Sequence, residues 1–300
     1  MLMPSGEQFE ITAGGYRAVI TESGAALRHL SFDGVDLVDG FADDEMASGG
    51  RGQLLMPWPN RIEDGRYTFE GSAQQLALTE PKRSNASHGL VRWAAWSVEE
   101  HTATSVSLTY RLMAQTGYPW TLDLHVQYDV SADGLTVTQS ATNLSDAAAP
   151  YASGAHPYLT VGTRLDDCEL VLPASTRGLA DPERLLPTGR TDVEGTPYDF
   201  RVSRPLKDTV FNDAFTDLRR GRDGRAEVLL RGDRAAMVLW VDEQHRWLQV
   251  YSADDVAGHD RRSLAVEPMT ANANAFNTGE DLVVVEPDET FSAVWGIRAL

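Results

Sequence analysis

The stretch WTLDLHVQYDV, residues 120–130, carries an apolar side chain at every second position. Those positions are Trp120, Leu122, Leu124, Val126, Tyr128 and Val130. Successive side chains of a β-strand point to opposite faces, so the pattern predicts a strand with one buried face and one exposed face. The stretch SVSLTYRLM, residues 105–113, alternates in the same way. Half-buried strands of this kind are typical of antiparallel sheets.

Turn residues separate these strands from their neighbours in sequence. The tetrapeptide SADG, residues 131–134, is followed by renewed alternation at Leu135 and Val137, which indicates a β-hairpin. Gly-rich turns recur along the chain, and no segment keeps a helical apolar stripe over several turns. The segment 173–205, rich in proline and glycine, is the most loop-like region. We therefore expect an all-β fold, a large antiparallel β-sandwich in which residues 1–300 form a single domain.

The charge of the chain argues against two classes of partner. Its 26 basic and 44 acidic side chains give a formal net charge of -18, with no basic block. Such a surface repels nucleic acid and anionic membranes, so we expect neither as a partner. The first residues, MLMPSGEQFEITAGG, lack the pattern of a secretion signal, and no apolar stretch approaches the roughly 20 residues of a membrane span. We therefore expect a cytoplasmic protein.

Cys168 is the only cysteine, which excludes an internal disulfide and fits a reducing compartment. It lies in LDDCELVLP, residues 165–173, where acidic neighbours discourage a thiolate. We expect a buried structural thiol rather than a nucleophile.

Two prolines stiffen the backbone before a polar pair in PWPNRI, residues 57–62. Pro57 and Pro59 restrict the chain just ahead of Asn60 and Arg61. An arginine on a rigid loop presents a planar fork of donors to an oxygen-rich ligand. Arg61 is therefore a candidate binding residue, and a solvated surface arginine is the alternative interpretation.

Two histidines lie beside residues that free or restrict the backbone. His88 directly precedes Gly89 in SNASHGL, and His156 stands between Gly154 and Pro157 in SGAHPYL. Glycine lets a chain approach a ligand closely, whereas proline limits the conformation of the residue before it. Each histidine fits a catalytic or binding role, with a hydrogen-bonded structural role as the alternative.

Two carboxylates complete the set of candidates. Asp213 lies between aromatic residues in FNDAF, and Glu267 follows the strand-like run LAV and precedes Pro268. A carboxylate at the end of an apolar strand is locally inconsistent, and such positions cluster at functional sites. The spacings of the histidines and carboxylates repeat no familiar ligand motif, so we expect no metal ion.

Taken in order, the motifs resemble those of the aldose 1-epimerase family, the mutarotases, which interconvert the α and β anomers of free sugars. The motifs are NRIEDGRYTFEG, SHGLVRW, TGYPWTLDLHVQY, SGAHPYL, NDAF and VEPMTANANAFN. They cover the chain from about Asn60 to Asn277. The resemblance implies a galactose mutarotase-like β-sandwich with an open sugar-binding cleft, a monosaccharide substrate and no cofactor. The form PWPNRI is similar to a bacterial subfamily that includes sulfosugar-associated proteins, so the sugar stays open, as does the choice between monomer and homodimer.

The resemblance also implies roles for individual residues. The family's general base falls on Glu267 and its general acid on His156. Its substrate-holding positions fall on Arg61, His88 and Asp213, and we add the neighbouring Asn60. An ionised Glu267 would take the proton of the C1 hydroxyl, while a solvated, protonated His156 would donate a proton to the ring oxygen. These two transfers open the ring.

Other interpretations of the same residues stay open. A hexose 6-phosphate mutarotase would add a phosphate-binding arginine cluster, for which Arg51, Arg83, Arg92 and Arg261 are the candidates. A glycoside hydrolase would use Glu267 and Asp213 as a carboxylate pair. A non-catalytic sugar-binding module would keep the cleft without the chemistry. Trp58, Tyr118 and Trp120 are candidates for stacking on a sugar, with core packing as the alternative.

Overall fold

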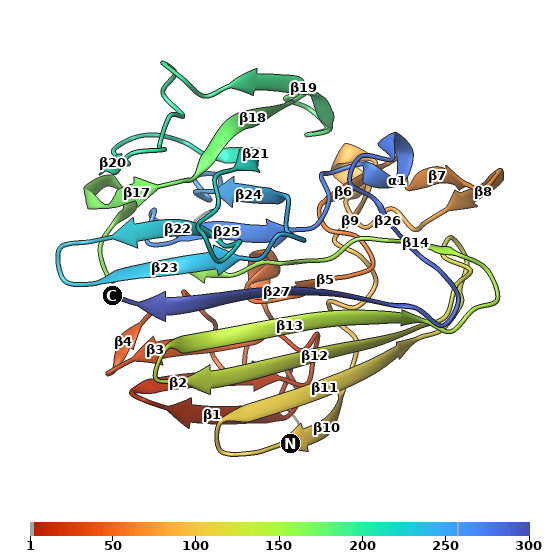
Figure 1. Ribbon diagram of the computed structural model, residues 1–300, viewed down its shortest axis with the longest axis horizontal. Coiled ribbons are helices and arrows are strands. Elements are labelled where there is room, and N and C mark those ends of the chain that lie inside the picture. The colour runs from red at the N-terminus through yellow and green to blue at the C-terminus, as the bar shows by residue number, and fades with distance from the viewer. Residues whose placement is uncertain (1–2, 257) are drawn as a thin grey trace.

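The computed structural model describes residues 3–256 and 258–300, and their architecture is almost entirely antiparallel β-structure (Figure 1). In spatial order, the nine-stranded sheet of this described part contains β10 (Ser97–His101), β11 (Ser105–Leu112), β12 (Leu122–Ser131), β13 (Gly134–Asn143), β27 (Thr290–Ala299), β23 (Ala236–Val241), β22 (Ala226–Arg231), β17 (Glu169–Val171) and β20 (Arg204–Pro205). The eight-stranded sheet contains β19 (Pro187–Asp192), β18 (Ala174–Ala180), β21 (Asn212–Leu218), β24 (Trp247–Tyr251), β25 (Leu264–Met269), β15 (Gly154–Ala155) and β5 (Leu54–Leu55), and β16 (Tyr158–Leu159) also pairs with β25.

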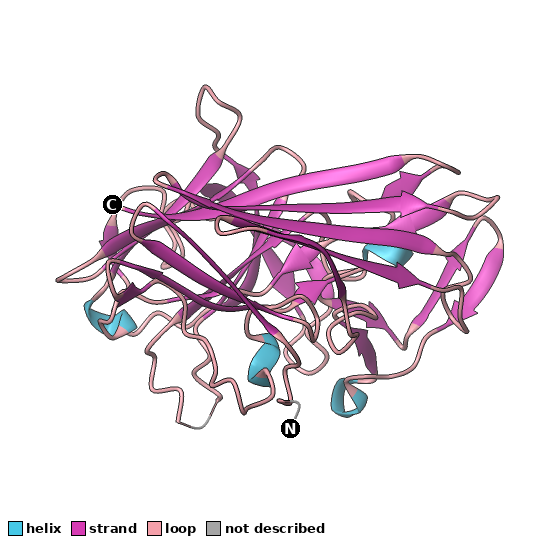
Figure 2. Cartoon of the chain, turned by 90° about the horizontal axis from the view of Figure 1, so that it is seen from below, coloured by secondary structure: helices cyan, strands magenta, loops and turns pink. Residues whose placement is uncertain are grey.

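Smaller sheets and short helices complete the chain. A four-stranded sheet contains β1 (Gln8–Ala13), β2 (Tyr16–Thr21), β3 (Leu27–Phe32) and β4 (Val35–Asp36). Three strand pairs are β6 (Arg61–Glu63) with β9 (Asn85–Ser87), β7 (Arg66–Phe69) with β8 (Ser72–Gln75), and β14 (Ala149–Tyr151) with β26 (Val283–Val285). The helical turns are η1 (Ser48–Gly50), η2 (Pro81–Arg83), η3 (Leu165–Asp167) and α1 (Ala275–Thr278). Figure 2 shows how short these helices are beside the long strands that cross the molecule.

The predicted hairpin is confirmed in β12 and β13. The two strands pair from Leu122 opposite Asn143 to Ser131 opposite Gly134, so the SADG turn joins them. The alternating residues of β12 from Leu122 to Val130 are buried, and Trp120 is buried just before the strand begins. The segment 173–205 is less loop-like than its composition suggests, because it forms β18, β19 and β20.

Buried polar contacts fix the eight-stranded sheet on the nine-stranded one. Gln139 of β13 donates a hydrogen bond to the carbonyl of Gly154 in β15 at 3.1 Å, and Trp295 of β27 donates to Gln139 at 3.0 Å. One continuous cluster of buried apolar residues reaches from Phe9 to Ile297. The hydrogen bond to Gly154 anchors β15, which pairs with β5 and β25, and the candidate site is built beside these three strands.

Three aromatic residues considered for sugar stacking belong to this core. Trp58, Tyr118 and Trp120 are all buried, and Tyr118 packs edge to face against Trp120. Their side chains therefore stabilise the fold. None of the helices in the described part of the chain has the length and apolar character needed to cross a bilayer.

Candidate functional site

A cavity of about 360 Å³ opens beside β25 and brings together five of the six predicted site residues. They are Asn60, Arg61, His88, His156 and Glu267. The first and last of these residues, Asn60 and Glu267, are more than 200 positions apart in the chain, so the tertiary fold brings the set into one place. The volume lies within the usual range for small-molecule sites.

Glu267 and His156 face each other across adjacent strands. Glu267 lies in β25, while His156 lies in the link between β15 and β16, both of which pair with β25. The distance from His156 Nε2 to Glu267 Oε1 is 3.3 Å. Both side chains are almost fully buried, with 5% and 3% exposed, yet both line the cavity. A proton can therefore pass between them or to a ligand in the cavity.

Burial changes the charge state that we expected for this pair. Loss of hydration lowers the pKa of His156 and raises the pKa of Glu267, so both groups favour their neutral forms near pH 7. The expectation of a solvated, protonated histidine is therefore wrong, because the side chain is buried and burial lowers its pKa. A neutral imidazole with a protonated carboxyl nevertheless carries the same single proton as an imidazolium with a carboxylate. The pair thus holds the one proton that an acid and a base must share.

The other faces of His156 are also defined by close packing. Tyr158 stacks on its ring with centroids 5.0 Å apart, and the Arg51 guanidinium lies 4.7 Å from the Tyr158 ring centroid. Gly50 has a φ of 79°, and a Cβ atom added there would lie 2.8 Å from His156 Cδ2. Only glycine fits this approach without displacing a neighbour, so η1 limits the movement of the His156 ring.

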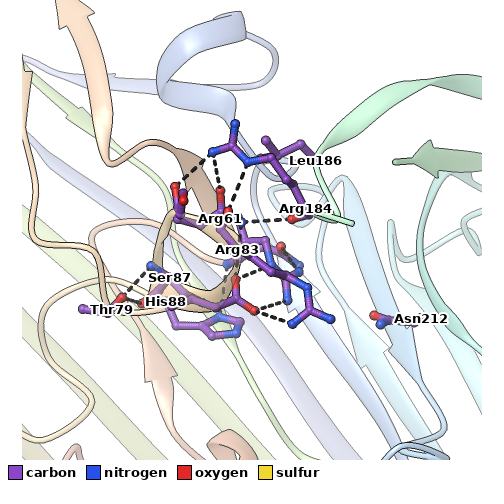
Figure 3. Close-up of polar contacts among 12 residues, drawn as sticks. Arg61, Thr79, Arg83, Ser87, His88, Arg184, Leu186 and Asn212 are labelled. Carbon is purple, nitrogen blue, oxygen red and sulfur yellow. Dashed lines mark hydrogen bonds and ion pairs between the residues drawn. The ribbon is translucent and has the colours of Figure 1, made fainter. Parts of the chain in front are cut away.

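Arg61 lines the cavity but already has an acidic partner. Its Nε donates to Glu80 Oε2 at 2.8 Å and its Nη2 to Glu80 Oε1 at 3.2 Å, while Nη1 donates to Asn60 Oδ1 at 3.1 Å (Figure 3). This fork holds the guanidinium in one orientation at the cavity wall. The stiff loop therefore presents Arg61 as an oriented donor rather than as a free cation.

His88 completes the wall next to His156. Its backbone has a φ of 60°, and its Nδ1 accepts a hydrogen bond from the Asn60 N–H at 3.2 Å. The rings of His88 and His156 meet edge to face, with centroids 5.6 Å apart. Burial lowers the pKa of His88, and His156 adds to this effect. The neutral ring that accepts at Nδ1 carries its proton on Nε2 and is therefore a hydrogen-bond donor there.

Asp213 is the predicted residue that lies outside the main cavity. It borders a smaller adjoining cavity with Asn60 and Arg61, and its Oδ1 accepts from Arg177 Nε at 2.9 Å and Nη2 at 2.6 Å. Its neighbour Asn212 lines both cavities and accepts from Gln249 at 3.2 Å. Neither Asn212 nor Gln249 was predicted as a site residue. Asn212 lies in the motif NDAF, which was the available signal, whereas nothing in the sequence distinguishes Gln249 from an ordinary strand residue.

Arg92 and Trp93 are two further cavity residues; Arg92 was predicted only as a candidate for a phosphate-binding cluster, and Trp93 was not predicted. Trp93 is 51% exposed, which is unusual for a large aromatic residue, and both residues border the cavity. Burial lowers the pKa of Arg92, and within the described residues its side chain forms no ion pair or hydrogen bond. Both lie in the motif SHGLVRW, and this motif was the available signal.

The other arginines named in the sequence analysis have acidic partners. Arg51 contacts Asp39 at 3.3 Å and Arg83 contacts Glu80 at 3.3 Å. Arg261 forms ion pairs with Asp166 and Asp254. The described residues contain no group of three or more histidine, cysteine, aspartate or glutamate side chains arranged to hold a metal ion.

Known proteins match this chain over nearly all of its length. The sequence model of a family described as aldose 1-epimerase matches residues 7–298. The uncharacterized protein YihR of Escherichia coli K12 is 36% identical over 299 residues, which are 98% of this chain and 94% of YihR.

Solved structures with lower sequence identity share the fold. The GalM/aldose epimerase homologue of C. elegans has a TM-score of 0.87 at 21% identity and covers 98% of each chain. The galactose 1-epimerase of Lactobacillus acidophilus NCFM has a TM-score of 0.81 at 20% identity, covering 96% of this chain and 92% of its own.

Proposed function

Because the chain belongs to the aldose 1-epimerase family, we propose that it is a mutarotase that interconverts the α and β anomers of an aldose. The observation that carries this proposal is the buried pair of Glu267 and His156, 3.3 Å apart at the wall of a cavity of suitable volume. A pure binding module has no need for an acid and a base in contact. Glycoside hydrolysis has less support, because Asp213 is engaged by Arg177 outside the main cavity.

The proposed reaction uses the single proton of the pair. Transfer of this proton from Glu267 to His156 gives a carboxylate and an imidazolium. The carboxylate takes the C1 hydroxyl proton, the bond between C1 and the ring oxygen breaks, and the imidazolium protonates that oxygen. Rotation about the C1–C2 bond presents the other face of the aldehyde, and the two groups exchange roles as the ring closes.

The remaining wall residues would hold the sugar for this chemistry. Arg61 and the Nε2–H of His88 are donors to hydroxyl or ring oxygens, and Asn60 offers an amide beside them. Asp213 would bind a sugar hydroxyl that reaches the adjoining cavity. Each proton transfer to or from a positioned group contributes about 10²- to 10⁴-fold in rate, which is sufficient for a reaction that also proceeds unaided in water.

Anomer exchange measured by NMR or polarimetry tests the proposal directly. Wild-type protein should accelerate exchange of at least one aldose, and Glu267→Gln should lose about 10²-fold or more of kcat. Glu227→Gln is the matched control, because this exposed residue of β22 pairs with Arg298 outside the cavity. Equal rates for wild type and Glu267→Gln would contradict the role of the pair.

Arg92 favours a narrower candidate, a mutarotase for an aldose with an anionic group. An unpaired guanidinium that loses hydration at a cavity wall is costly unless a ligand supplies the negative charge. The rest of the protein is strongly acidic, so this cation is not a general feature of the surface. Phosphate, sulfonate and carboxylate groups all have the required charge and acceptor oxygens.

Substrate comparison separates this candidate from the broader one. We expect kcat/KM to be higher for glucose 6-phosphate or sulfoquinovose than for glucose, and Arg92→Gln to lower it about tenfold or more for the charged sugar alone. This difference should shrink as salt concentration rises. Equal losses on neutral and charged sugars would assign Arg92 to general sugar binding.

A further inference from the structure

A short loop crosses from the edge of the eight-stranded sheet to the cavity. This strap, residues 181–186, connects β18 to β19 and places Leu185 at the border of both the main and the adjoining cavity. Leu185 is a partly exposed apolar side chain among mainly polar cavity residues. Such a side chain can cover the apolar face of a sugar ring and exclude water from it.

The backbone of Leu185 adopts a conformation that leucine disfavours. Its φ is 56°, in the left-handed region, where a branched side chain is rare outside strained sites. Asp181 holds the turn in this shape, because its carboxylate accepts the backbone N–H groups of Glu183, Arg184 and Leu186 at 3.1, 2.6 and 3.0 Å. Strain of this kind persists only where surrounding contacts enforce it.

Arg184 fastens the strap to the opposite wall. Its guanidinium donates to Glu63 Oε1 at 3.2 Å, to Asp64 Oδ1 at 2.7 Å and to the carbonyl oxygens of Arg83 and Ser84 at 3.1 and 3.0 Å (Figure 3). These acceptors lie at the end of β6, which begins at Arg61, and just before β9, which ends one residue before His88. One side chain therefore connects the strap to the segment that carries two predicted sugar-binding residues.

Asn85 strengthens this connection from the other side. Its Nδ2 donates to the backbone carbonyl of Arg184 at 2.9 Å, and Asn85 is fully buried. The strap is thus attached through both the side chain and the backbone of Arg184. These contacts fix the backbone on both sides of Leu185 and so hold its side chain at the border of the cavity.

We propose that Leu185 contacts the sugar and that Arg184 is the positioning residue that holds Leu185 over the cavity. This inference rests on the proposed function and adds a sugar-contacting residue that motif comparison did not suggest. Neither residue forms a hydrogen bond or ion pair with Glu267 or His156. The strap is therefore expected to govern sugar binding and to leave the proton transfers unchanged.

Substitutions at the two positions separate this role from a purely structural one. Leu185→Gly removes the apolar side chain, while glycine accepts the left-handed backbone without strain, so the fold should be as stable as wild type or more so. We expect KM to rise about tenfold with kcat changed less than about twofold, the pattern of lost uniform binding. Arg184→Ala should raise KM similarly. The KM of Arg184→Lys should lie between those of Arg184→Ala and wild type, because one ammonium group replaces only part of the hydrogen bonds of the guanidinium.

Arg201→Ala is the matched control. Arg201 also forms a two-point ion pair, with Asp199, and borders no cavity that the site uses. Its KM should equal that of wild type. An unchanged KM in both Leu185→Gly and Arg184→Ala would overturn the strap proposal while leaving the mutarotase proposal intact.

Binding provides a readout that does not depend on turnover. If wild type accelerates no sugar, the proposed function fails, and the dissociation constants of the same sugars for wild type and the two strap variants decide the inference. Dissociation constants about tenfold weaker in both variants would support the strap. Equal constants, or no saturable binding, would overturn it.

Discussion

Replacement of Glu267 by glutamine is expected to change how the stability of the protein depends on pH. Burial raises the pKa of Glu267 from its ordinary 4.5 to about 8, since the carboxylate loses its hydration. Among the described residues, no partner donates a hydrogen bond to Oε2. The unfolded chain therefore releases this proton near pH 4.5, whereas the folded chain holds it to about pH 8. Where the folded state binds more protons than the unfolded state, stability falls as pH rises.

His156 acts in the opposite direction over part of this range. Burial lowers its pKa from 6.5, so below that pH the folded state binds fewer protons than the unfolded state, and stability rises with pH. The two slopes oppose each other below about pH 6.5, and only that of Glu267 is left between about pH 6.5 and 8. One proton is worth about 1.4 kcal/mol per pH unit, so wild type should lose about 2 kcal/mol across this window.

Urea unfolding at several pH values between about 6.5 and 8 measures the effect. Glu267→Gln has no proton to lose, so its free energy of unfolding should stay level and exceed that of wild type by about 2 kcal/mol more at pH 8 than at pH 6.5. The exposed Glu227→Gln control should follow the wild-type curve. Parallel curves for wild type and Glu267→Gln would refute the account of a desolvated carboxyl.

The same charges and contacts give three further expectations. The kcat/KM of the proposed reaction should fall above about pH 8, where the pair of Glu267 and His156 loses its shared proton; a rate that stays constant through this pH would count against the pair. Gly50→Ala should lower kcat about tenfold or more, because the added Cβ atom displaces His156. Gly34 has a similar φ of 80°, but a Cβ atom added there would meet no atom within 4 Å, so Gly34→Ala should only destabilise the protein by about 1 kcal/mol. Equal activities of the two variants would contradict the close approach of Gly50 to His156. Burial raises the pKa of Cys168 to about 11, so a thiol reagent at pH 8 should label it only after unfolding, and rapid labelling of the native protein would show that it is accessible.

The order of polar and apolar residues predicted the class of fold because strand formation leaves a local signal. The alternation from Leu122 to Val130 predicted one buried face, and the SADG turn predicted the hairpin that β12 and β13 form. Short strands without sustained alternation gave no such signal. The segment 173–205 looked like a loop, yet β18 and β19 pair there, and β18 also pairs with β21, which joins both strands to the eight-stranded sheet.

The residue types of the candidate site were also present in the sequence, since the ordered motifs around Arg61, His88, His156 and Glu267 identified the family resemblance. The charge state of the Glu267–His156 pair could not be predicted from the sequence, because a pKa depends on burial, and burial depends on strands distant in the chain. The ion-pair partners of the site residues also depend on the tertiary structure. Glu80 pairs with Arg61 and Arg177 pairs with Asp213, whereas the Arg92 side chain forms neither an ion pair nor a hydrogen bond in the described chain.

The long alternating strands, the turn between β12 and β13 and the types of chemical group in the site could therefore be predicted from residues close together in the chain. Which groups meet, which are already paired and which keep a proton near pH 7 depends on the tertiary structure. It alone placed Leu185 over the cavity, through contacts from Arg184 to residues about 100 positions away or more. Long-range packing sets distance and desolvation, and these two quantities fix the electrostatics of a site.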